Sequence, residues 1–313
     1  MRLASIDIGT NTLLLLVADI DKNGNLQPIA FEQRLPRLGK DVDQLKSINH
    51  SAFERISAII LEYKAIAARL QASNIIACGT SAIREAANRS EFISYIETKT
   101  GIAVEVLSGD DEALWTYRGA VSDVQGIPFQ TLVLDIGGGS TEISFPNPNQ
   151  QNGNLKLNRY SLQLGSVRLT ERYFKHNPPL QTEVENATQF ILEELSQVHN
   201  PGFHKYQLIG VAGTATTLAC LDQQLMEFDI DKVTGYRMDQ QTVLQWSMKL
   251  QSMTIEQIRS LSNTTEGRAD ILTAGVLILS ETMKLFGLPS LEISERGLRY
   301  GLILREWERN VRL

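Results

Sequence analysis

The residues of this chain best suited to chemistry are an aspartate and a turn of glycine with small hydroxyl or amide side chains, which occur together twice. In the first copy an apolar segment ends at Asp7, and the turn contains Thr10, Asn11 and Thr12. Glycine lets such a turn bring backbone N–H groups close to a ligand, and hydroxyl groups add further donors. A carboxylate at the end of a strand can hold a cation. The pattern therefore predicts a phosphate-binding loop beside a metal ligand.

The second copy begins 128 positions further along the chain, at Asp135 (135 − 7 = 128). Its residues are Asp135, Gly137, Gly138, Gly139, Ser140, Thr141 and Glu142. Either copy alone is typical of a β-hairpin turn, but two copies in the same register favour a function. Two such loops facing each other would form a clamp for phosphate and metal. The duplication predicts two related domains with a ligand-binding cleft between them.

Common nucleotide-binding motifs do not account for these turns. The chain has no Gly-Lys-Ser or Gly-Lys-Thr run, which excludes a Walker loop. In a G-x-G-x-x-G pattern that begins at Gly137, the third glycine would fall on Glu142. The alternating residues 142–145 predict a strand at this point rather than a helix.

The composition limits the class of protein and its location. A chain of 313 residues with 42% hydrophobic residues is long enough for two domains with a substantial core. No apolar run predicts a membrane span, and the N-terminus does not resemble a signal peptide. Cys78 and Cys220 lack metal-binding spacing, and we expect a cytoplasmic protein. A net charge of −6 argues against nucleic acid as a partner.

Periodicity predicts how the first half folds. Residues 3–18 form a strand pair, and Ser51 with Glu54 is typical of a capping box that opens an amphipathic helix. A short strand at 75–78 leads through a Gly-Thr-Ser turn into a helix that carries Arg84. Helices and strands continue to alternate, which predicts a mixed sheet covered by helices.

Further along the chain, a domain boundary is expected near residues 125–128, directly before the second copy of the turn. The polar segment 146–158, with a turn at 152–153, is predicted to join two strands rather than two domains. Further predicted elements are helices from 165 and over 183–198 and strands over 208–212 and 291–294, in an otherwise helical remainder.

Several candidate residues also have a simpler structural explanation. Asp7 could bind an ion through water or cap its own turn. The acidic residues 110–112 suit a helix N-terminus by capping and by the helix dipole. Arg84 could be a solvated helix arginine or could point at an anion held by the preceding turn. Gly213 and Thr214 could form a third phosphate-binding turn or simply begin a helix.

In their order along the chain, these motifs resemble the exopolyphosphatase/guanosine pentaphosphate phosphohydrolase (Ppx/GppA) family, within the actin–hexokinase–Hsp70-like superfamily. The matching segments are 7–12, 37–39, 79–84, 108–113, 135–142, 164–171, 213–218, 268–271 and 294–301. Each motif is weak alone, whereas the ordered set is highly specific. The resemblance implies two actin-like (ribonuclease H-like) α/β domains with an interdomain cleft. We expect domain I to comprise residues 1–125 and 298–313, and domain II residues 126–297.

The resemblance also implies roles for individual residues. Glu112 is expected to be catalytic, Asp135 to bind Mg²⁺ with Asp7 as a further metal ligand, and Glu142 to line the same site. The expected phosphate-binding residues are Thr10, Asn11, Thr12, Arg84, Gly137, Gly138, Gly139, Ser140, Thr141, Gly213 and Thr214. We expect a homodimer that has neither a membrane nor a nucleic acid as partner.

The sequence therefore predicts an exopolyphosphatase that uses Mg²⁺ and releases orthophosphate from the end of inorganic polyphosphate. Hydrolysis of guanosine pentaphosphate (pppGpp) is the close alternative, and an actin-like ATPase or sugar kinase and a non-catalytic polyphosphate or alarmone sensor are less favoured. Two departures from the family pattern bear on the substrate. Leu14 stands where relatives often carry a basic residue, and the chain ends at Leu313, as in a short form without a C-terminal helical extension. We therefore expect no strong preference for long polymers.

Overall fold

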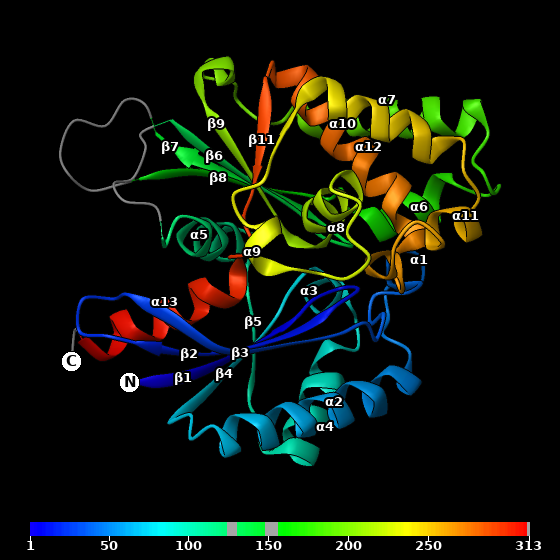
Figure 1. Ribbon diagram of the computed structural model, residues 1–313. Helices are drawn as coiled ribbons and strands as arrows, with labels where there is room; N and C mark the ends of the chain where they lie inside the picture. Colours follow the sequence, from blue (N-terminus) through cyan, green and yellow to red (C-terminus); the bar gives the residue numbers. More distant parts are fainter. Residues whose placement is uncertain (124–129, 148–155, 312–313) are drawn as a thin grey trace. The chain divides into compact units, whose positions relative to one another are not determined.

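The computed structural model describes residues 1–123, 130–147 and 156–311 of the chain (Figure 1). Within these residues, no helix is long and apolar enough to cross a bilayer. The boundary expected near 125–128 and the turn expected at 152–153 lie outside the described residues.

The chain divides into two compact units. Unit 1 contains residues 1–125 and 296–313, and unit 2 contains residues 126–295. Unit 2 is thus one continuous segment, inserted before the C-terminal helix of unit 1.

Unit 1 consists of a mixed sheet with helices on both faces. Its elements are β1 (Arg2–Ile8), β2 (Leu13–Ile20), β3 (Leu26–Arg34), α1 (Val42–Leu45), α2 (His50–Arg69), β4 (Asn74–Gly79), α3 (Ser81–Glu85), α4 (Arg89–Thr100), β5 (Val104–Val106), α5 (Gly109–Ala120) and α13 (Leu298–Val311). The strand order is β3-β2-β1-β4-β5, with β1 antiparallel to β2 and parallel to β4.

Alternation along the first two strands explains why both faces of this sheet are covered. On β1, Ala4, Ile6 and Ile8 pack into the core formed with α2 and α4. Leu3 packs into a second core with α13, and the Ser5 hydroxyl donates to the Arg299 carbonyl at 2.8 Å. Successive side chains of a strand point to opposite faces. Asp7, at the end of the strand, therefore lies on the face that α13 covers.

Unit 2 repeats this arrangement and adds further helices. Its elements are β6 (Thr131–Ile136), β7 (Thr141–Pro146), β8 (Leu157–Leu162), α6 (Ser166–Tyr173), α7 (Gln181–Leu195), η1 (Phe203–Lys205), β9 (Gln207–Val211), α8 (Ala212–Asp222), α9 (Ile230–Val233), β10 (Arg237–Asp239), α10 (Gln240–Gln251), α11 (Ile255–Arg259), η2 (Asn263–Thr265), α12 (Ala269–Phe286) and β11 (Ser290–Ile293). The strand order is β10-β11-β9-β6-β7-β8.

The two sheets share one connectivity. In each, three strands form an antiparallel meander, and the first of them also pairs in parallel with the fourth. The fourth strand pairs in parallel with one more strand, which is β5 in unit 1 and β11 in unit 2. Unit 2 adds β10 antiparallel to β11 at its edge. The prediction of two related α/β domains with the actin-like, ribonuclease H-like arrangement is confirmed.

Some local expectations were wrong or incomplete. The capping box at Ser51 is absent, because α2 begins at His50 and its cap is Asn49, whose side chain accepts from the Ser51 N–H at 2.9 Å. The Ser51 hydroxyl instead accepts a hydrogen bond from Arg55 at 3.1 Å. Strand β10 was not predicted, since its three residues carry too short a pattern to be recognised.

Candidate functional site

The loop of the first hairpin is a tight turn between β1 and β2. The Gly9 N–H donates to the Thr12 carbonyl at 3.0 Å, and strand pairing resumes between Ile8 and Leu13. The Thr10 hydroxyl lies 3.1 Å from the Ser81 hydroxyl at the start of α3, and both residues are buried. The segment after β4, with its Gly-Thr-Ser sequence, is therefore fixed directly against the first loop.

The loop of the second hairpin has the same turn. The Gly137 N–H donates to the Ser140 carbonyl at 3.0 Å, and pairing resumes between Ile136 and Thr141. The Thr141 hydroxyl is buried and donates to the Leu164 carbonyl at 2.6 Å. This hydroxyl is therefore used within the protein, whereas the loop backbone is formed by glycines that leave room for a ligand.

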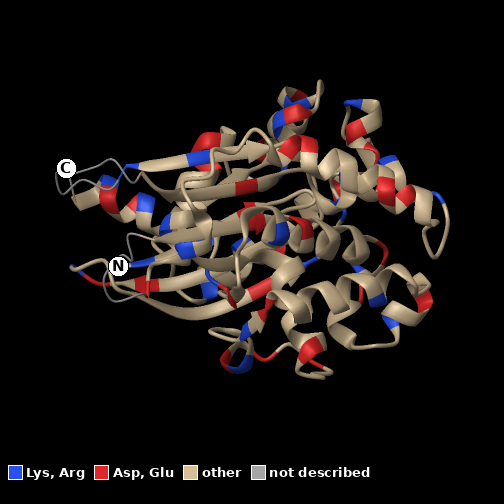
Figure 2. Cartoon of the chain, turned by 90° about the horizontal axis from the view of Figure 1, so that it is seen from above, with Lys and Arg blue, Asp and Glu red and all other residues tan. Residues whose placement is uncertain are grey.

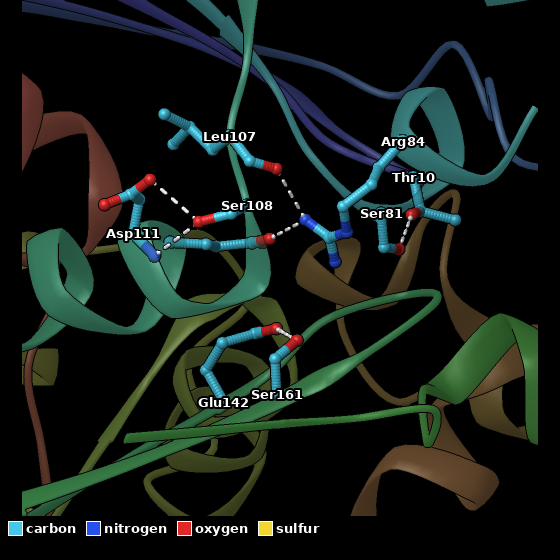
Figure 3. A network of polar contacts seen from close by, with 9 residues as sticks. Thr10, Ser81, Arg84, Leu107, Ser108, Asp111, Glu142 and Ser161 are labelled. Carbon is cyan, nitrogen blue, oxygen red and sulfur yellow. Dashed lines mark hydrogen bonds and ion pairs between the residues drawn. The ribbon is translucent and has the colours of Figure 1, made fainter. Parts of the chain in front are cut away.

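In unit 1 the structure brings Arg84 and Glu112 into direct contact (Figure 3). Nη1 of Arg84 donates to Oε2 of Glu112 at 2.7 Å and to the Leu107 carbonyl at 3.0 Å. Nη2 of the same guanidinium is buried and has no hydrogen-bond partner among the described residues. Nη2 of Arg84 is thus a buried hydrogen-bond donor for which the described residues supply no acceptor.

Glu112 differs from the acidic residues that precede it on α5. Ser108 caps this helix, accepting from the Asp111 N–H at 3.1 Å, and Asp110 and Asp111 are exposed. Glu112 is only 7% exposed and lies on the buried face of the helix. The segment therefore contains the cap Ser108, two exposed acids and one carboxylate that points inward.

The packing of α5 on α13 fixes the position of this carboxylate. A Cβ on Gly119 would lie 2.1 Å from the Gly297 carbonyl oxygen, and one on Gly301 would lie 1.9 Å from the Trp115 carbonyl oxygen. Only glycine permits this close approach of the two helices. The C-terminal helix, contributed by the far end of the chain, thus holds the helix that carries Glu112.

The environment of Glu112 sets its protonation. Burial raises the pKa of this carboxyl, and the Arg84 guanidinium opposes the shift by favouring the ionised form. The net direction is upward. A carboxylate whose pKa is raised towards neutrality is a better proton acceptor than a solvated one.

In unit 2, Asp135 and Glu142 lie directly opposite each other on β6 and β7. Leu134 and Ile143 pack into the core of this unit, so the two acids occupy the other face of the hairpin. Glu142 is almost fully buried and accepts from the Ser161 hydroxyl at 2.8 Å (Figure 3). Like charges directly opposite each other in a sheet are destabilising.

Gly213 and Thr214 lie in the first turn of α8, directly after β9, the parallel neighbour of β6. A Cβ on Gly213 would lie 1.5 Å from Nη1 of Arg268, so the guanidinium rests against this turn. Arg268 is buried, which lowers its pKa to about 10. The sequence contained Arg268 within a matching motif but did not single it out, since only the tertiary contact relates it to Gly213.

A metal centre made only of protein side chains is not found in residues 1–123, 130–147 and 156–311. No group of three or more His, Cys, Asp or Glu residues there could hold an ion. Magnesium commonly uses one or two carboxylates together with water and phosphate oxygens. The neighbouring carboxylates of Asp135 and Glu142 supply oxygen ligands of this kind.

Comparison with known proteins gives a family match over nearly the whole chain. The model of the Ppx/GppA phosphatase family matches residues 16–310. "Exopolyphosphatase 2" of Mycobacterium tuberculosis is 31% identical over 97% of this chain and 98% of its own length. A bifunctional 3-dehydroquinate synthase/phosphatase of Fusobacterium nucleatum is 32% identical over 96% of this chain, which spans 46% of that protein. A guanosine-5'-triphosphate,3'-diphosphate pyrophosphatase of Vibrio cholerae is 27% identical over 96% of this chain and 58% of its own length.

Solved structures agree with this match. The Ppx/GppA family member of Aquifex aeolicus superimposes with a TM-score of 0.82 at 30% identity, covering 99% of this chain and 98% of that one. A structure described as an exopolyphosphatase-like protein gives a TM-score of 0.92 at 30% identity, with the same coverage of both chains.

Proposed function

Because the chain belongs to the Ppx/GppA phosphatase family, we propose that it is an exopolyphosphatase. It would hydrolyse the terminal phosphoanhydride of inorganic polyphosphate and release orthophosphate. The named relative from M. tuberculosis, which matches over almost its full length, supports this substrate. Hydrolysis of pppGpp is the second candidate, and the V. cholerae relative is the observation that favours it.

The buried contact between Glu112 and Arg84 carries the proposal. It pairs a carboxylate of raised pKa with a guanidinium that retains an unsatisfied buried nitrogen. We assign Nη2 of Arg84 to an oxygen of the terminal phosphate. A phosphate bound there would lie next to the carboxylate of Glu112, where an attacking water must be activated.

In the proposed reaction, Glu112 orients a water molecule and accepts its proton. The water oxygen forms a bond to the terminal phosphorus while the bond from that phosphorus to the bridging oxygen breaks. The products are orthophosphate and a chain that is one phosphate shorter. Such transfers depend mainly on positioning and charge neutralisation, which the arginine and the loop N–H groups would provide.

The two loops would bind the phosphates. In this proposal each unit contributes phosphate donors of its own. Unit 1 contributes the backbone of Thr10, Asn11 and Thr12. Unit 2 contributes Gly137, Gly138, Gly139, Ser140 and Thr141 and the turn at Gly213 and Thr214. Lys and Arg residues are interspersed with Asp and Glu residues along the chain (Figure 2). Local donors, rather than the net charge of −6, would therefore attract the anion.

Mg²⁺ fits the carboxylates of unit 2. Asp135 and Glu142 are adjacent and on one face, an arrangement that a divalent cation would stabilise against their mutual repulsion. We propose that these two residues hold the ion and that Asp7 contacts it through water. When bound, the ion would neutralise charge on the phosphate oxygens.

The test measures phosphate release by the purified chain from long polyphosphate, short polyphosphate and pppGpp in parallel, with Mg²⁺. Glu112→Gln, prepared identically, controls for contaminating phosphatases. Release from polyphosphate above that of pppGpp supports the first candidate, and the reverse order supports the second. ADP formation that depends on a sugar would favour a kinase, and tight polyphosphate binding without turnover would favour a sensor; either result contradicts the proposal.

Location and assembly are part of the same proposal. Both cysteines of the chain are buried and unpaired, which suits a reducing cytoplasm. The proposed homodimer rests on the family resemblance alone. Light scattering on the purified chain would show whether its mass is twice 34.9 kDa.

A further inference from the structure

The segment that follows the third strand of each sheet supports the loop of that unit's hairpin. In unit 2 the N–H of Ser166 donates to the Gly137 carbonyl at 2.9 Å. The N–H groups of Val167 and Arg168 both donate to the Gly138 carbonyl, at 2.9 and 3.1 Å. The first turn of α6 therefore holds two consecutive carbonyls of the glycine loop.

The Arg168 side chain extends this contact to the next carbonyl. Its Nε donates to the Gly139 carbonyl at 2.7 Å, a short distance typical of a charged donor. Arg168 is only 4% exposed. Three consecutive loop carbonyls are thus bound from the α6 side, the last of them by a buried guanidinium.

Gly165 makes this approach possible. Its backbone is extended, so its conformation does not itself require glycine. A Cβ at this position would, however, lie 2.4 Å from the Gly138 carbonyl oxygen and 2.6 Å from the Gly139 carbonyl carbon. Any side chain here would displace the loop or the segment that supports it.

Unit 1 has a corresponding segment. The Gly39 N–H donates to the Thr10 carbonyl at 2.7 Å, and the Arg37 N–H donates to the Asn11 carbonyl at 3.2 Å. A Cβ on Gly39 would lie 2.1 Å from Cγ2 of Thr10. Each support contains a Leu-Gly pair after the third strand, at 38–39 and 164–165. The duplication therefore includes the supports as well as the loops.

Peptide geometry determines what this support does. In a trans peptide the carbonyl of one residue and the N–H of the next point in opposite directions. Carbonyls of Gly137, Gly138 and Gly139 that point to α6 therefore turn the N–H groups of Gly138, Gly139 and Ser140 away from it. Successive N–H groups directed to one side form an anion-binding concavity.

From this geometry we infer that Arg168 is a positioning residue for phosphate binding. Its bond to the Gly139 carbonyl fixes the peptide whose N–H belongs to Ser140, and so directs that donor to the ligand. The identity of the ligand as a phosphate chain rests on the proposed function. The Arg168 guanidinium binds the carbonyl of the loop peptide and would act on the ligand through that peptide.

A purely structural role makes a different prediction. The N–H groups at the start of a helix need acceptors, and the loop carbonyls satisfy those of α6 whatever the loop binds. That need explains the backbone bonds of Val167 and Arg168, but it does not explain a buried guanidinium on the Gly139 carbonyl. The side chain of Arg168 is therefore where the two explanations separate.

The experiment compares Arg168→Met and Arg168→Lys with Arg172→Met in the full chain. Arg172 lies one turn further along α6 and stacks on Phe190 at 5.3 Å, so its replacement makes the same change of charge in the same helix. We measure kcat and KM for short polyphosphate. We also measure amide hydrogen exchange of segment 137–141 with and without inorganic phosphate.

If Arg168 positions the loop, Arg168→Met lowers kcat roughly tenfold to a hundredfold, while KM changes about threefold or less. Exchange in 137–141 becomes faster, and inorganic phosphate slows it less than in the wild type. Arg168→Lys, which keeps the charge but not the planar group, falls between Met and wild type. Arg172→Met behaves as wild type.

Wild-type kcat and wild-type exchange in Arg168→Met would overturn the inference, as would an equal loss in Arg172→Met. If Arg168→Met does not fold, Arg168→Lys decides, and unchanged kcat and exchange in that variant count against the inference. If the wild type releases no phosphate from any substrate, the proposed function fails. The exchange measurement with inorganic phosphate needs no turnover and still decides the role of Arg168.

Discussion

The hairpin loop of unit 1 and that of unit 2 follow the same backbone path but carry different side chains. In each, the first glycine donates to the carbonyl three residues later at 3.0 Å, and a Leu-Gly segment binds the loop carbonyls from behind. In each, the aspartate before the turn also has a parallel neighbour on the fourth strand, Cys78 for Asp7 and Val211 for Asp135. The shared path turns backbone N–H groups outward in both units.

The difference lies across the strand pair. Opposite Asp135 is Glu142, whereas opposite Asp7 is Leu14. Unit 2 therefore presents two adjacent carboxylates, and unit 1 presents one. Unit 1 has instead the partly buried ion pair of Glu112 and Arg84, on elements outside its hairpin.

In the proposed reaction, the two copies of the duplicated fold therefore have different roles. The proposed phosphate donors are backbone N–H groups in both units, because such groups do not depend on side-chain identity. Charge then assigns separate roles: the proposed cation site belongs to unit 2, and the proposed base belongs to unit 1. Substitutions at equivalent positions should therefore have unequal effects.

The largest effect is expected for the base in unit 1. Glu112→Gln keeps the shape of the side chain but cannot accept a proton, so kcat should fall roughly a hundredfold or more. Substrate affinity should remain nearly intact, since the loops and Arg84 are unchanged. Steady-state kinetics with short polyphosphate measure both quantities. Near-normal turnover in a folded Glu112→Gln protein would show that Glu112 is not the base and only belongs to the N-terminal turn of α5.

The next effect contrasts the two aspartates. Asp135→Asn should raise the Mg²⁺ concentration for half-maximal activity roughly tenfold, because it removes one of the two carboxylates proposed to hold the ion. Asp7→Asn, at the equivalent position without a facing carboxylate, should shift it less. Titration of activity with Mg²⁺ gives both values. An unchanged requirement in Asp135→Asn would reject that residue as a ligand, and equal shifts would remove the proposed difference between the units.

Much of this comparison could be predicted from the sequence. The two turns have a local signal, since each combines an aspartate, glycine and flanking apolar strands within about ten residues, and the alternation of apolar residues predicts the sheet. Local competition explains one error: Asn49 and Ser51 could each cap α2, and pattern alone did not distinguish them.

The supporting contacts had no such signal. Arg84 and Glu112 are 28 positions apart in the sequence, and Arg168 and Gly139 are 29 positions apart. Their motifs could be recognised, but only the folded chain shows which side chain meets which carbonyl or carboxylate. The pKa of Glu112 likewise depends on burial that no local pattern reveals.

A moderate effect is expected on the pH dependence. Arg84 lowers the pKa of Glu112 against the upward shift caused by burial, so Arg84→Met should raise this pKa further. A base must be deprotonated to act, and activity should therefore be lost at a higher pH on the acidic side than in the wild type. The pH profile of kcat measures this. Arg89→Met is a matched control, because the exposed Arg89 side chain donates to the Arg84 carbonyl and not to the carboxylate of Glu112. If the acidic limb of the pH profile does not move, or moves to lower pH, Arg84 does not lower the pKa of Glu112.

The smallest effect is expected for the dependence of hydrolysis on polyphosphate length, and Leu14 is the residue that tests it. The family resemblance implies a basic side chain at this position, and Leu14 removes that candidate contact with a polyanion. We expect short polyphosphates to be hydrolysed at least as well as long ones, per chain end, at physiological ionic strength. Leu14→Arg should lower KM by a few-fold, an effect that added salt weakens because exposed charges are screened. Glu142 and Asp135 are unchanged in this variant, so its Mg²⁺ requirement should stay the same. A strong preference of the wild type for chains of hundreds of phosphates would contradict the expectation. Contacts with only the last few phosphates cannot distinguish long chains from short ones.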